Sequence, residues 1–209
     1  MQLRIVGLGD STTAGTPGFL SPLEAPPNGR GNPESQYAYW IMKAHPDWMV
    51  LNRGINGQRS DEILARFELD VEQERSDCVI VLVGVNDVYQ GVPLESVKRN
   101  LLEIYQKALT RKLALVAATV LPYNTASAPE AKAIRDLNNW IRETVNRLTV
   151  LFCDTNLAVR DPNDPDRLRS SPDGLHPDVS GYRKMGEALV ETIDSGLKSG
   201  LIKTQKRSS

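Results

Sequence analysis

Five short runs of apolar residues, rich in β-branched side chains, limit what this chain can fold into. Each run is apolar throughout and does not alternate with polar residues, which is typical of strands buried on both faces of a sheet. The runs span residues 2–8, 48–51, 78–83, 113–119 and 149–152. We therefore predict five parallel β-strands at the centre of an α/β protein.

Amphipathic segments separate these predicted strands. Apolar residues recur at helical spacing over residues 93–111, 129–148 and 179–197, and shorter helical patterns begin near residue 36 and at Ser60. This alternation predicts a three-layer α/β fold, with helices on both faces of the five-stranded parallel sheet and right-handed crossovers. For five such strands we expect the flavodoxin-like order 2-1-3-4-5.

The length of 209 residues fits one domain, which we place at residues 1–197. Residues 198–209 carry lysine and arginine but no acidic residue, and we expect them to form a frayed C-terminal tail. Residues 16–35 hold five prolines and three glycines, which indicates a functional loop over the sheet edge. Whether this loop acts as a lid stays open.

Composition excludes several classes of function. A net charge of −1 gives no long-range attraction to nucleic acid, and no apolar run approaches the roughly 20 residues of a membrane helix. The N-terminus lacks the pattern of a signal peptide, so a cytoplasmic protein is the default expectation. Cys78 and Cys153 lie in strand-like segments and are expected to be buried, reduced thiols. The oligomeric state stays open.

Polar and glycine-rich blocks follow the predicted strands. They are residues 9–15 after the first strand, 52–57 after the second, 84–87 after the third, and 173–177 after the fifth and a long loop. Ligands bind beyond the carboxyl ends of the strands in such sheets. The blocks supply a hydroxyl, backbone amides, a carboxamide, a carboxylate and an imidazole, which together are the parts of an acyl-transfer site.

The chain has two histidines, and their positions differ in what they allow. His45 precedes the second strand, and a strand spans roughly 17–20 Å, so His45 cannot reach Ser11 at the other end of the sheet. His176 lies on the same edge as Ser11. Asp173 precedes it by three residues across a turn with Gly174, so this carboxylate can fix the imidazole tautomer.

An acyl-transfer site also needs donors for an oxyanion. A glycine such as Gly57 lets backbone approach closely, and the carboxamide of Asn86 can donate beside it. These features predict Ser11 as nucleophile, His176 as base, Asp173 as its partner, and Gly57 and Asn86 as oxyanion donors.

The four blocks together resemble the SGNH (GDSL-type) hydrolases over nearly the whole chain. The resemblance implies an oxyanion hole formed by the Ser11 amide, the Gly57 amide and the Asn86 side chain. It also implies that no metal or organic cofactor is needed, and that Asp10 and Asp87 brace the loops. Thr12 departs from the family pattern, which most often has leucine there, and this affects packing or substrate fit rather than the triad.

The expected activity is hydrolysis of short-chain, aryl or lysolipid carboxylic esters through an acyl-serine, with a small-molecule ester as the partner. A carbohydrate O-deacetylase is the alternative on the same machinery. Phe19, Leu20 and Leu23 could line an acyl site or pin the loop to the core.

Two hypotheses from other classes stay open. The hydroxyls and amides of residues 11–16 follow a strand where flavodoxin-like proteins bind flavin or phosphate. A metal phosphoesterase would use Asp10, Asp87, Asp173 and His176 as metal ligands, although only one histidine is then available to bind the metal.

Overall fold

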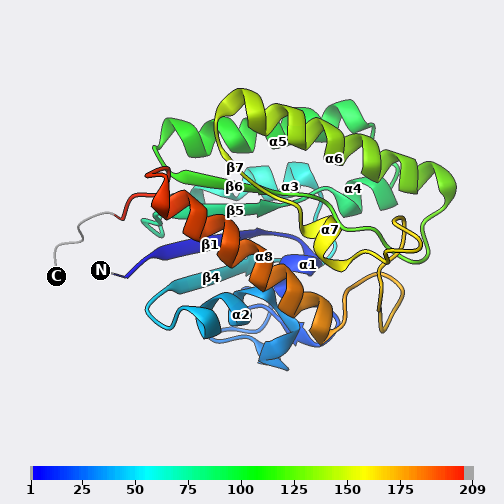
Figure 1. The fold of residues 1–209 in the computed structure, drawn as a ribbon, viewed down its shortest axis with the longest axis horizontal. Helices are drawn as coiled ribbons and strands as arrows, with labels where there is room; N and C mark the ends of the chain where they lie inside the picture. The colour runs from blue at the N-terminus through cyan, green and yellow to red at the C-terminus, as the bar shows by residue number, and fades with distance from the viewer. Residues whose placement is uncertain (1, 205–209) are drawn as a thin grey trace.

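A parallel β-sheet forms the middle layer of the computed structural model, which describes residues 2–204 (Figure 1). Its strands are β1 (Arg4–Gly9), β4 (Met49–Gly54), β5 (Cys78–Leu82), β6 (Ala114–Ala118) and β7 (Leu151–Cys153). They lie in the order β4-β1-β5-β6-β7, and each neighbouring pair is parallel. Counted along the chain, this order is 2-1-3-4-5. The predicted fold class and strand order are confirmed.

Helices cover both faces of the sheet (Figure 1). On one face lie α3 (Ser60–Ala65), α5 (Leu94–Thr110) and α6 (Ala128–Leu148); on the other lie α2 (Tyr37–Ala44) and α8 (Val179–Lys198). Strand β5 shows how the core is divided, because side chains of a strand alternate between faces. Val79 and Val81 join the first apolar cluster, and Cys78, Ile80 and Leu82 join the second.

Several short elements were not predicted, because runs of two to five residues are too short to show a helical or strand period. They are α1 (Ser11–Ala14), η1 (Pro33–Ser35), η2 (Glu68–Glu72), α4 (Val85–Tyr89), α7 (Thr155–Val159) and the antiparallel pair β2 (Phe19–Leu20) and β3 (Arg30–Gly31). The hairpin organises the proline-rich loop. The hydroxyl of Ser21 donates to the carbonyl of Gly54 at 2.6 Å, which fixes the loop to the end of β4.

The expectation of a frayed tail from residue 198 is wrong for the residues that directly follow α8. Gly200 adopts a left-handed conformation with φ of 76°, which turns the chain back. The amide of Ile202 then donates to the carbonyl of Gly196 at 3.0 Å, and its side chain is buried in the second apolar cluster. Residues 205–209 lie outside the described residues.

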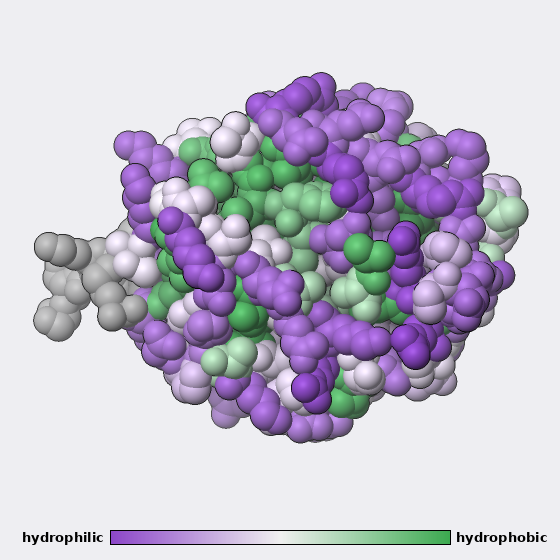
Figure 2. Space-filling view, viewed as in Figure 1, coloured by the Kyte–Doolittle hydropathy of each residue, from purple (hydrophilic) through white to green (hydrophobic). Residues whose placement is uncertain are grey.

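The helices present mostly hydrophilic residues outward, and hydrophobic residues gather in the band between the two helical layers (Figure 2). This band lies where β7 forms one edge of the sheet. Cys78 and Cys153 are buried free thiols, as predicted. None of the helices within residues 2–204 has the length and apolar character needed to cross a bilayer.

Candidate active site

Ser11 lies at the carboxyl end of β1, at the start of the single-turn helix α1. Asp10 caps this helix, since its carboxylate accepts a hydrogen bond from the amide of Thr12 at 2.9 Å. Gly15 ends the helix in the left-handed region, with φ of 110°, where glycine is favoured. The side chain of Ser11 is therefore held by backbone geometry on both sides of it.

Ser11, His176 and Asp173 form one hydrogen-bonded chain. His176 Nε2 lies 2.8 Å from Ser11 Oγ, and His176 Nδ1 lies 2.7 Å from Asp173 Oδ2. Because Nδ1 faces a carboxylate, we assign the imidazole proton to Nδ1, so that Nε2 accepts from the serine hydroxyl. The structure thus brings these three side chains together.

Asp173 is held by its own turn as well as by the imidazole. Its Oδ1 accepts hydrogen bonds from the amides of Leu175 (2.9 Å) and His176 (2.8 Å). Burial alone would raise the pKa of Asp173, but the hydrogen bonds from the His176 ring and from these two amides lower the pKa below its ordinary value. A carboxylate of this kind stays ionised and can hold the neighbouring imidazole in one orientation.

Gly57 and Asn86 line the same pocket as Ser11 and His176, a cavity of about 260 Å³. Gly57 has φ of 76°, and no atom lies within 4 Å of the position that a Cβ would occupy. The side-chain amide of Asn86 donates to the carbonyl of Gln58 at 3.0 Å, which uses one of its two N–H groups. The structure thus brings four of the predicted site residues to one pocket, with Asp173 behind His176.

The comparisons with known proteins match this arrangement. The model of the GDSL-like lipase/acylhydrolase family matches residues 8–184. The chain belongs to this family. A curated relative, an acetylxylan esterase of Geobacillus stearothermophilus, is 25% identical over 158 residues, which are 69% of this chain and 71% of the relative.

Solved structures of other GDSL proteins share the fold. A structure from Desulfitobacterium hafniense, assigned to the lipolytic proteins of the G-D-S-L family, has a TM-score of 0.76 and 25% identity, covering 90% of this chain and 98% of that one. A lipase/acylhydrolase of Enterococcus faecalis has a TM-score of 0.72 and 20% identity, covering 98% of this chain and 100% of the other. The second likeness, at its low identity, concerns the fold alone.

Two buried carboxylates lie beneath the site of this GDSL protein. Asp87 accepts hydrogen bonds from the amide (2.9 Å) and the hydroxyl (2.6 Å) of Ser60, which ties α4 to α3. Burial raises the pKa of Asp10 to about 7, the hydrogen bond from the Thr12 amide opposes this, and the charge of Asp87 raises the pKa further. Burial also raises the pKa of Asp87, against the two bonds from Ser60.

Arg66 and Asn52 are bracing residues for which sequence reasoning gave no role. Arg66 donates to the carbonyls of Gly9 (2.8 Å) and Arg53 (2.9 Å), so that one guanidinium joins the ends of β1 and β4. Asn52 donates to the carbonyl of Ala14 at 3.0 Å, at the end of α1. Nothing marks Arg66 in the sequence, because it follows an amphipathic helix as an ordinary polar residue.

Apolar side chains form one wall of the pocket: Val85, Tyr89, Tyr123 and Leu175. Tyr89 is 56% exposed, and its ring lies edge-on to that of Tyr123 with centroids 6.0 Å apart. Phe19 and Leu20 do not line this pocket. Phe19, in strand β2 of the hairpin, is instead buried, which favours the interpretation that it pins the loop to the core.

His45 lies away from the site, as predicted. It ends α2, its ring stacks on Trp48 with centroids 3.8 Å apart, and its Nε2 lies 3.5 Å from Asp194 Oδ2. Among residues 2–204, no group of three or more histidine, cysteine, aspartate or glutamate side chains is placed to hold a metal ion. The four residues of the phosphoesterase hypothesis therefore form no such group.

Proposed function

We propose that this protein hydrolyses carboxylic esters through an acyl-serine intermediate on Ser11. The observation that carries the proposal is the chain of hydrogen bonds from Ser11 Oγ to His176 Nε2 (2.8 Å) and from His176 Nδ1 to Asp173 (2.7 Å). Nucleophile, base and orienting carboxylate within such distances are the signature of an activated serine.

The reaction follows from these contacts. Ser11 Oγ attacks the ester carbonyl while His176 Nε2 takes the hydroxyl proton, and Asp173 stabilises the imidazolium that forms. The amides of Ser11 and Gly57 and the remaining N–H of Asn86 hold the oxyanion. The tetrahedral intermediate collapses, and the leaving alcohol takes the proton back from His176. Water then attacks the acyl-serine while His176 takes its proton; the acid leaves, and Ser11 Oγ takes that proton back from His176.

The size and lining of the pocket support small acyl groups. Its volume of about 260 Å³ is below the roughly 300–1,000 Å³ of most small-molecule sites, and its wall of Val85, Tyr89, Tyr123 and Leu175 is apolar. We therefore propose short-chain or aryl esters as substrates. A lysolipid would need its longer chain to extend past Tyr89, which lies exposed at the pocket.

A carbohydrate O-deacetylase is the second candidate. An acetyl group fits the same pocket, and the curated relative described above is an acetylxylan esterase. The flavin- or phosphate-binding hypothesis has less support, because it gives no role to Asp173 or to a histidine bonded to the loop hydroxyl. A purified protein with a flavin spectrum would favour it.

Covalent labelling with a fluorophosphonate tests the nucleophile. The wild type should label, and Ser11→Ala should not, while Ser171→Ala, a nearby serine hydroxyl that donates to the carbonyl of His176, should label. Equal labelling of Ser11→Ala and the wild type would contradict the proposal. Nitrophenyl esters of increasing acyl length, compared with acetylated sugars, then distinguish the two substrate classes.

A further inference from the structure

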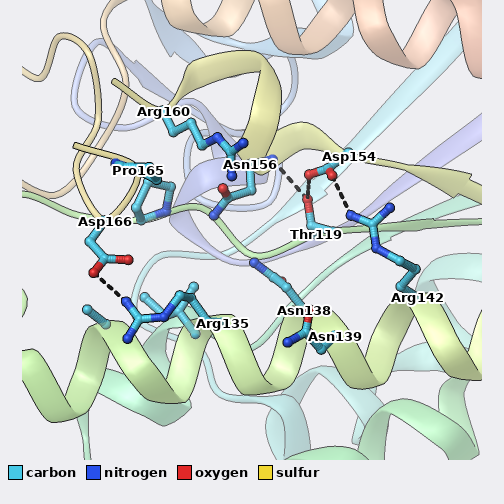
Figure 3. A pocket seen from close by; sticks show the side chains of 13 residues that line it. Thr119, Arg135, Asn138, Asn139, Arg142, Asp154, Asn156, Arg160, Pro165 and Asp166 are labelled. Atoms are coloured by element: carbon cyan, nitrogen blue, oxygen red, sulfur yellow. Dashed lines mark hydrogen bonds and ion pairs between the residues drawn. The ribbon is translucent and has the colours of Figure 1, made fainter. Parts of the chain in front are cut away.

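A second cavity, of about 190 Å³, opens beyond the ends of β6 and β7. It lies between α6 and the segment that holds α7 and residues 160–166 (Figure 3). From α6, the side chain of Asn138 points toward Asn156 across it, and Arg135 lies beside Asp166 (Figure 3). No residue of the proposed catalytic machinery lines this cavity.

The charges in the cavity do not balance. Asp166 pairs with Arg135, and Asp154 accepts from Arg142 at 2.7 Å, so both carboxylates are engaged by arginines. Asp154 is also held by the Thr119 hydroxyl at 2.9 Å. Three arginines and two aspartates line the cavity, so the positive charge of one arginine, Arg160, is not balanced by a lining carboxylate.

Arg160 is half-buried, and its guanidinium makes no hydrogen bond or ion pair with any side chain or carbonyl in the part of the chain that the structure describes. A guanidinium carries five N–H donors in a flat fork that matches a carboxylate or a phosphate. An arginine in this state, inside a cavity, is therefore a donor set ready for an oxyanion.

The rest of the lining suits a hydroxylated ligand with an apolar face. Asn156 donates to the carbonyl of Val120 at 2.9 Å, which leaves its own carbonyl oxygen as an acceptor, and the exposed Asn139 can both donate and accept. Ile134 and Pro122 supply apolar surface. Asn138 bonds both the amide (2.7 Å) and the carbonyl (2.8 Å) of Val120, which fixes the wall.

We propose that this cavity binds a small hydroxylated molecule that carries a carboxylate or phosphate group, with its oxyanion on Arg160. The site is built independently of Ser11 and His176, yet it borders their pocket, because Pro122 lines this cavity and its neighbour Tyr123 lines the catalytic one. The ligand therefore lies on one side of the segment that holds Pro122 and Tyr123, and the apolar wall of the catalytic pocket lies on the other side.

Calorimetric titration with three probes tests the proposal: glucose 6-phosphate, glucuronate and neutral glucose. At least one of the anionic probes should bind the wild type, and glucose should bind at least tenfold more weakly, since a charge-assisted hydrogen bond contributes about tenfold or more in affinity. Binding of one anionic probe and not the other identifies the oxyanion as phosphate or carboxylate.

Two variants and a matched control locate the site. Arg160→Gln and Asn139→Asp should each weaken binding of the anionic probe by about tenfold, the first by removing the guanidinium and the second by adding a carboxylate to the lining of the cavity. Arg99→Gln, which removes an exposed arginine on α5, should leave the affinity unchanged. Binding should persist in Ser11→Ala, so it does not depend on the proposed function. The proposal would be overturned if neither anionic probe bound the wild type. It would also be overturned if Arg160→Gln and Asn139→Asp bound the probe as tightly as the control Arg99→Gln.

Discussion

A Cβ atom on Gly54 would lie 2.1 Å from the amide nitrogen of Ala14. Gly54 is the last residue of β4, and Ala14 ends the single-turn helix that carries Ser11. The strand and the helix are therefore in direct backbone contact, and only a glycine leaves room for it.

Gly54→Ala should push α1 away from β4. We expect a loss of about 1–3 kcal/mol in the free energy of unfolding, the usual cost of overpacking, and a fall in kcat as Ser11 moves from His176. Urea unfolding and ester kinetics measure the two effects. Gly91→Ala is the control, since Gly91 has no atom within 4 Å of the Cβ position and its φ of 71° costs only the left-handed strain, roughly 1–2 kcal/mol. Activity of Gly54→Ala equal to that of the control would contradict this account.

Asp10 should make stability depend on pH. Its pKa is raised by burial from 3.8 to about 7, so the folded state binds a proton more tightly than the unfolded state does. The free energy of unfolding should therefore fall as pH rises between these values. Asp10→Asn removes the charge and keeps an oxygen for the amide of Thr12. We expect its stability relative to the wild type to improve by a few kcal/mol, about 1.4 per pKa unit, between acidic and mildly alkaline pH.

The control for this experiment is Asp136→Asn, which removes a carboxylate that is 43% exposed on α6. Urea unfolding across the same pH range measures both variants against the wild type. If Asp10→Asn and the wild type lost stability in parallel across the range, Asp10 would not be the titrating group.

Asp173→Asn should reduce kcat by about 10⁴-fold, because an amide no longer fixes the proton on His176 Nδ1. The fold should persist, since the new carboxamide keeps an oxygen to accept the amides of Leu175 and His176. Asp161→Asn is a matched control, because Asp161 also accepts a backbone amide, that of Asn163 at 2.8 Å, in the same irregular part of the chain. Ester kinetics should show the lower kcat of Asp173→Asn, and its urea unfolding curve should match that of the wild type. A near-normal kcat would show that Asp173 is not part of the proposed triad.

The strands could be predicted from the sequence because a sheet buried on both faces demands uninterrupted apolar runs. Strand β4 shows the limit: it runs on to Gly54, past Asn52 and Arg53, which read as loop residues by composition. They belong to the strand because β1 pairs with them, and this pairing depends on tertiary structure rather than on local sequence. For β7 the difference is at the start of the strand. The sequence pattern predicts a strand from residue 149, whereas the pairing with β6 begins only at Leu151.

The candidate site was likewise predictable only in part. Asp173 and His176 were predictable, because their spacing forms a local turn. The bracing by Arg66 and the cavity around Arg160 were not predictable, since each joins elements that are distant along the chain. A polar residue on an amphipathic segment carries no mark of which distant carbonyl or ligand it will meet.

The hydrogen bond between Ser11 and His176 joins positions that are 165 residues apart. During synthesis the hydroxyl leaves the ribosome long before the imidazole is made. The loop that presents the serine is complete early, yet its proposed base follows only 165 residues later. If the proposed function holds, a chain cut short anywhere before His176 carries the proposed nucleophile without the base that would activate it.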